Sequence, residues 1–117
     1  MYVSLWFRAF LVTWLSEACV AVPMLRATRE SRLRRFGAVT LVNVASHPAV
    51  WFVFPELGMT YLWMFVVAET WAVSSETLAY RLVFPKLGWL RALAIALIAN
   101  GVSVAAGLLL RAVGVPL

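Results

Sequence analysis

The stretch 66–80, VVAETWAVSSETLAY, decides how this chain has to fold. It lies inside a long apolar run, yet it carries two carboxylates, Glu69 and Glu76, and ends at Tyr80. Positions 69, 72, 76 and 80 are three or four residues apart, so these side chains share one face of a helix. A carboxylate that faces lipid is costly, so this face must turn toward the interior of a protein. The stretch therefore predicts a membrane helix that lines a polar interior.

The composition of the whole chain agrees with a membrane location. Hydrophobic residues make up 64% of the 117 residues, and charged residues make up only 13%. A soluble domain averages about 45–50% apolar and about 25% charged residues. We therefore expect an integral membrane protein that forms one domain over residues 1–117.

Four apolar segments are each close to the roughly 20 residues that cross a bilayer. They cover about 3–25, 36–54, 59–84 and 90–110. Short connections make consecutive helices antiparallel neighbours. The predicted fold is an all-α membrane protein, a compact bundle of four transmembrane helices.

Basic residues between these segments predict the orientation in the cell (inner) membrane. The turn 55–58 has no basic residue, whereas the loops 26–35 and 85–91 are basic. The positive-inside rule places both basic loops in the cytoplasm and both termini on the outer side. Anionic lipid is the expected partner of the first loop, at Arg26, Arg29, Arg32, Arg34 and Arg35. Nucleic acid is not expected, because no polar surface interleaves basic and aromatic residues.

Polar residues of all four segments fall at comparable depths in the membrane. With a rise of about 1.5 Å per residue, they lie roughly 10 to 20 Å from the cytoplasmic ends of their helices. The shallower level is shared by Glu17, Asn43 and Glu76. About one helical turn deeper lie His47 and Asn100, and Glu69 lies deepest. We therefore expect one intramembrane polar site, to which all four helices contribute. Its members are Glu17, Asn43, His47, Glu69, Glu76 and Asn100.

Four further residues are expected to support this site. Hydroxyl side chains form hydrogen bonds between membrane helices. A proline removes one helix N–H donor and frees a carbonyl, here that of Val44. A tyrosine near the inner boundary suits either an interfacial anchor or a site hydroxyl. The supporting residues are Ser46, Pro48, Tyr80 and Ser103.

The leading functional hypothesis is the handling of a proton, a cation or a small polar solute within the membrane, in transport or ion coupling. Two carboxylates that face one cavity can share a proton or bind a cation. The first alternative is a non-catalytic structural or assembly subunit, working as a homo-oligomer or with other membrane subunits. In that alternative the polar side chains only bond one another across the helices.

The second alternative is a metal site made of carboxylate and imidazole ligands, with His47, Glu69 and Glu76 as candidates. The Glu-x-x-His motif of di-metal bundles is absent, and Glu69 and Glu76 stand seven residues apart. The sequence requires no cofactor. Motifs such as G-x-S-x-G and H-E-x-x-H are also absent, so no catalytic residue is assigned and an enzyme is the weaker interpretation.

Overall fold

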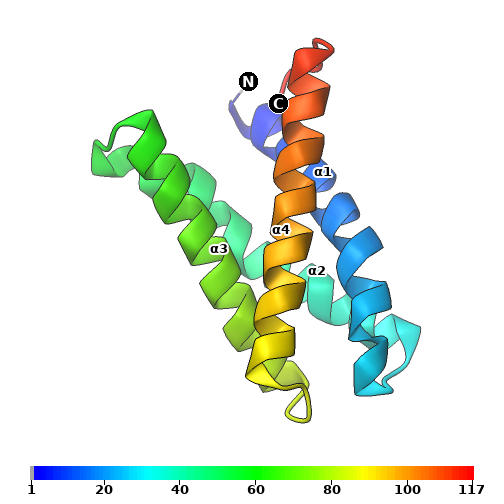
Figure 1. Ribbon diagram of the computed structural model, residues 1–117. Helices are drawn as coiled ribbons and strands as arrows, with labels where there is room; N and C mark the ends of the chain where they lie inside the picture. Colours follow the sequence, from blue (N-terminus) through cyan, green and yellow to red (C-terminus); the bar gives the residue numbers. More distant parts are fainter. Residues whose placement is uncertain (1) are drawn as a thin grey trace.

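The computed structural model describes residues 2–117 and shows four long α-helices (Figure 1). These are α1 (Tyr2–Met24), α2 (Arg32–Phe52), α3 (Tyr61–Val83) and α4 (Trp89–Ala112). Two short 3₁₀ turns, η1 (Leu25–Thr28) and η2 (Phe54–Leu57), lie in the first two connections, and residues 2–117 contain no strand. The predicted all-α, four-helix architecture is confirmed.

The four helices form a ring in which each packs against two neighbours. Both α1 and α3 pack against α2 on one side and against α4 on the other. The α1–α2 and α3–α4 connections lie at one end of the bundle, which we call the basic end (Figure 1). The two termini lie near each other at the opposite end, on the same side as the α2–α3 connection. We call this the terminal end.

The start of α2 corrects the predicted boundary at residue 36. Ser31 is the N-cap, and its Oγ accepts a hydrogen bond of 3.1 Å from the backbone N–H of Arg34. Such a cap satisfies one of the N–H groups that a helix start leaves free. The arginines from Arg32 onward therefore form the first turn of a helix and not a loop. The other helix bounds differ from the predicted ones by one or two residues.

Arg35 fastens the end of α1 to the start of α2. Its side chain is buried, and its Nη1 donates a hydrogen bond of 2.6 Å to the Val22 carbonyl. Carbonyls in the last turn of a helix have no donor within the helix, and a cation there also complements the helix dipole. At the other end of α2, Gly58 has a φ of 65°, a backbone conformation that glycine adopts without strain.

Polar and apolar side chains are arranged inside out compared with a soluble protein. Large apolar side chains are exposed on every helix, among them Phe7, Leu41, Leu62, Leu82 and Leu109. The buried polar residues face the interior. They are Glu17, Arg35, Asn43, Ser46, His47, Glu76, Asn100 and Ser103. A bilayer demands this arrangement, because lipid offers polar groups no hydrogen-bond partner.

Three helical stretches are long and apolar enough to cross a membrane, namely Tyr2–Thr28, Arg32–Leu57 and Trp89–Ala112. The fourth predicted span, α3, is not among them. It carries two glutamates and four serine or threonine residues among its 23 residues, which lower its mean hydropathy. Its buried residues include Glu76 and Tyr80, whereas Leu62 and Trp63 are exposed. Glu76 thus lies on the inward face, whereas Thr70 and Ser74 are exposed.

An apolar core closes the basic end of the bundle, and we call it the plug. Small residues let the helix backbones approach one another there, as is usual in membrane bundles. Tyr80 is the largest fully buried side chain. The plug consists of Ala18, Ala21, Leu25, Ala38, Val39, Val42, Tyr80, Phe84, Leu87, Ala92, Ile95 and Ala99.

Candidate functional site

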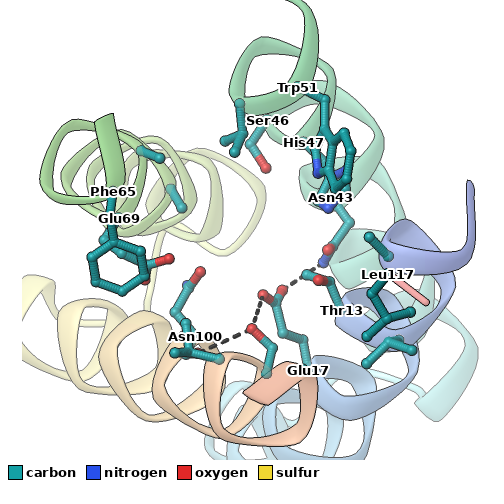
Figure 2. Close-up of a pocket in the computed structure, with 18 of the residues that line it drawn as sticks. Thr13, Glu17, Asn43, Ser46, His47, Trp51, Phe65, Glu69, Asn100 and Leu117 are labelled. Carbon is teal, nitrogen blue, oxygen red and sulfur yellow. Dashed lines mark hydrogen bonds between the residues drawn. The ribbon is translucent and has the colours of Figure 1, made fainter. Parts of the chain in front are cut away.

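Glu17 joins three helices at the centre of the bundle. Its side chain is 0% exposed. Asn43 of α2 donates from Nδ2 to Glu17 Oε2 at 2.7 Å, and Ser103 of α4 donates from Oγ to Glu17 Oε1 at 3.3 Å (Figure 2). A carboxylate buried among apolar helices is thereby given a donor for each oxygen.

Glu76 of α3 is held in the same way by the neighbouring helix. It is 2% exposed, and Asn100 of α4 donates from Nδ2 to its Oε2 at 2.7 Å. Each of the two asparagines also donates from Nδ2 to its own helix, Asn43 to the Val39 carbonyl at 3.1 Å and Asn100 to the Ala96 carbonyl at 2.9 Å. Both hydrogens of each amide nitrogen are used, so the amide is fixed with its nitrogen toward the acid.

The two acid–amide pairs are linked to each other. Ser103 Oγ lies 3.0 Å from the Asn100 carbonyl as well as 3.3 Å from Glu17. A hydroxyl has one hydrogen, so Ser103 can serve these two acceptors only in turn. The carboxylates of Glu17 and Glu76 are also close enough for their charges to interact. The four helices therefore hold one polar cluster.

Glu69 lies farther from the basic end, two helical turns from Glu76 on α3. It is half-buried, and its carboxylate points toward the space between the helices (Figure 2). Like Glu17 and Glu76, it lines the interior cavity. Three acids therefore face one interior space.

That space is a cavity of about 210 Å³ to which all four helices contribute. Its floor lies at the level where the plug begins and consists of Glu17, Asn43, Glu76, Asn100 and Ser103. The other lining residues lie toward the terminal end, where exposed Tyr61 and Arg111 mark the mouth. The apolar plug closes the cavity toward the basic end, whereas exposed residues line it toward the terminal end.

His47 lies on the cavity wall, but its ring has aromatic neighbours. Ring centroids lie 5.4 Å away for Phe10 and 6.4 Å away for both Trp6 and Trp51. The side chain is buried, and its Nδ1 has no hydrogen-bond partner among residues 2–117. From the sequence, His47 is expected at a depth similar to that of the acids. In the structure its imidazole ring instead lies among aromatic rings, on the terminal-end side of the buried acids.

The supporting residues occupy different places. Ser46 is buried in the cavity wall, and its carbonyl accepts a hydrogen bond of 3.2 Å from Trp71 Nε1. Pro48 follows Ser46 by two residues and is half-buried. Ser103 belongs to the floor of the cavity as a direct hydrogen-bond partner of Glu17. Tyr80 is 0% exposed inside the plug, so it is not an anchor at the lipid interface.

Several lining residues were not predicted from the sequence, notably Thr13 and Phe65. The sequence does contain a signal for Thr13 and Phe65. Thr13 precedes Glu17 by four residues and Phe65 precedes Glu69 by four, so each continues the face of a predicted acid by one helical turn. A search for charged and amide side chains alone does not find these wall residues.

The metal candidates do not converge. In the described part of the chain, no three His, Cys, Asp or Glu side chains are grouped as a metal site requires. His47 is held among rings, and Glu69 and Glu76 are two turns apart on one helix.

Comparisons with known proteins add no further constraint. No family model, no curated protein and no solved structure matches this chain. The function has to be inferred from the paired acids and the cavity above them.

Proposed function

We propose that this protein handles a proton or a small cation at Glu17 and Glu76, in transport or ion coupling. The observation that carries the proposal is the position of these two buried acids at the floor of a cavity lined by all four helices. Intramembrane acids that face a cavity mark ion and proton pathways in general.

The charge around the acids supports this proposal. Their hydrogen-bond donors, Asn43, Asn100 and Ser103, are all neutral. Among the described residues that line the cavity, Arg111 is the only arginine or lysine. It lies at the mouth and donates a hydrogen bond of 3.2 Å to the Leu117 carbonyl. Neighbouring carboxylates with no basic partner need a proton or a cation to balance them in an apolar surrounding.

The size of the cavity fits a small, partly hydrated solute. At about 30 Å³ per water molecule, 210 Å³ corresponds to about seven waters. Trp51, Tyr61 and Phe65 contribute aromatic surface to the walls above the acids. Aromatic faces attract organic ammonium groups, so a small organic cation suits the cavity as well as an inorganic one.

In the membrane, we place all four helices across the bilayer, with the basic end in the cytoplasm and the terminal end outside. Both basic connections lie at the same end of the bundle, which the positive-inside rule requires for this orientation (Figure 1). In α3 the two glutamates turn inward, so its outer face can contact lipid. The cavity then opens outward, and the plug separates its floor from the cytoplasm.

Charge-neutral substitution in reconstituted vesicles tests the proposal. Glu17→Gln and Glu76→Gln keep the size of the side chain and a carbonyl acceptor for the asparagine, but they cannot release a proton or carry a charge. Each variant should abolish the movement of protons, or the cation-coupled movement of protons, across the vesicle membrane. This movement is followed as a change in internal pH with a pH-sensitive dye inside the vesicles. Glu56→Gln is the matched control, because Glu56 is exposed in η2 and does not line the cavity. Unchanged flux in the two cavity variants contradicts the proposal.

The alternative is a structural or assembly subunit, and one observation favours it. The hydrogen bonds of the cluster join α1 to α2, α1 to α4 and α3 to α4, which would also fix the helix register. In this case a second copy or another membrane subunit would occupy the open side of the cavity. Wild-type vesicles without flux, combined with a defined oligomer or complex that Glu76→Gln disrupts, would favour this alternative.

A further inference from the structure

A second cavity, of about 190 Å³, lies at the basic end, between the end of α1 and the start of α2. Its walls combine residues of α1, among them Cys19, Val22 and Pro23, with three arginines. We call it the arginine pocket, after Arg26, Arg32 and Arg35.

The polarity of the arginine pocket changes along its length. Cys19 and Pro23 are exposed on the outer face of α1, which contacts lipid in the proposed membrane orientation. The arginines follow toward the basic end, where the helices leave the membrane. An apolar wall below a basic rim matches a phospholipid, whose acyl chains lie in the hydrocarbon and whose phosphate lies at the interface.

Arg35 gives the pocket a fixed cationic side. It is 8% exposed, and two hydrogen bonds hold its guanidinium, from Nη1 to the Val22 carbonyl at 2.6 Å and from Nε to the Ser31 carbonyl at 3.4 Å. Guanidinium groups bind phosphate oxygens well, and one that is already ordered loses less freedom on binding.

The start of α2 contributes a second source of positive potential. Arg32 is the first residue of this 21-residue helix, and Ser31 caps the N–H of Arg34. The helix dipole places partial positive charge at this end, which favours a phosphate. No acid is present among the described lining residues, and Glu30 instead pairs with Arg34 at 3.0 Å on another side.

We propose that the arginine pocket binds the phosphate headgroup of an anionic membrane phospholipid, with Arg26, Arg32 and Arg35 as its contacts. The five arginines of the segment 26–35 then divide into two groups. Arg29 and Arg34 do not line the pocket, and Arg34 is already paired with Glu30. Because the bound lipid contacts both α1 and α2, it stabilises their hairpin. This site does not depend on the function of the inner cavity.

Two double variants with the same loss of charge test the site. R26Q/R32Q removes the free arginines of the pocket, and R29Q/R34Q removes two charges from the same segment outside it. Arg35 is left in place because it also caps α1. The detergent-solubilised protein is titrated with phosphatidylglycerol, with phosphatidylcholine and with inorganic phosphate. Lipid binding is measured by native mass spectrometry, together with the shift in Tm.

Phosphatidylglycerol should bind the wild type and R29Q/R34Q with similar affinity and raise the Tm of both. Binding to R26Q/R32Q should be roughly 30-fold weaker, because this variant loses two charge-assisted contacts to the phosphate oxygens. If the two double variants lose the same affinity for phosphatidylglycerol, general charge attraction explains the binding and the proposed pocket is wrong. An equal Tm shift with inorganic phosphate overturns the lipid as the ligand, and an equal response to phosphatidylcholine overturns the selectivity for anionic headgroups.

Discussion

Asn43 Nδ2 lies 2.7 Å from Glu17 Oε2, and this hydrogen bond joins α2 to α1 at the floor of the cavity. Asn43→Ala leaves a fully buried carboxylate without its amide donor. The expected loss in the free energy of unfolding is about 1–3 kcal/mol. Equilibrium unfolding in mixed micelles, followed by circular dichroism, measures it.

The control for this prediction is Thr70→Ala. The Thr70 hydroxyl is exposed and donates only to the Val66 carbonyl of its own helix, at 2.7 Å. Its removal should change stability by less than about 0.5 kcal/mol. If Asn43→Ala costs no more than Thr70→Ala, the interhelical bond contributes little to the fold.

Tyr80→Phe should stabilise the protein. The Tyr80 hydroxyl is buried in the plug, and no partner for it exists in residues 2–117. A buried unpaired hydroxyl costs free energy, so its removal should raise the free energy of unfolding by about 1 kcal/mol. Tyr2→Phe is the matched control, because the Tyr2 hydroxyl donates to the Trp51 carbonyl at 2.5 Å. A loss of stability in Tyr80→Phe would show that the hydroxyl has a partner in the membrane.

Two glycine substitutions should act in opposite directions. Gly58 has a φ of 65°, so Gly58→Ala forces a side chain into the left-handed region and should cost about 1–2 kcal/mol. Gly37 lies within α2, and a Cβ there meets no atom within 4 Å. Gly37→Ala should therefore stabilise by about 0.5–1 kcal/mol. Melting curves of the two variants in the same detergent test both signs, and the same sign for both would contradict these backbone conformations.

Thiol labelling should show that the cavity opens at the terminal end. In a Cys19→Ser background, Ala72→Cys places a thiol on the cavity wall, whereas Ala99→Cys places one in the plug. A charged, membrane-impermeant thiol reagent added on the outer side should modify the first and not the second, because the thiolate forms only where water reaches it. Labelling of both positions at one rate would mean that the plug is open to water.

The helices, and the relative levels of the polar residues along them, could be predicted from the sequence alone. Apolar segments of membrane length fix the helices. The constant rise per residue converts each residue number into a depth. Glu17 and Asn43 have the same predicted depth and are hydrogen-bonded in the structure. Glu76 and Asn100, which differ by about one helical turn, also form a bond. The start of α2 was misplaced because five arginines outweighed the capping signal of Ser31.

The tertiary structure decided what depth cannot specify, namely the order of the helices around the bundle and the rotation of each about its axis. These depend on side-chain packing between segments distant in sequence, which places α1 against α4 and closes the ring. This packing brings Ser103 within hydrogen-bond distance of Glu17. It also surrounds His47 with aromatic rings and buries Tyr80 in the plug. It also makes the polar residues the floor of a cavity, since apolar packing between small residues closes the basic end.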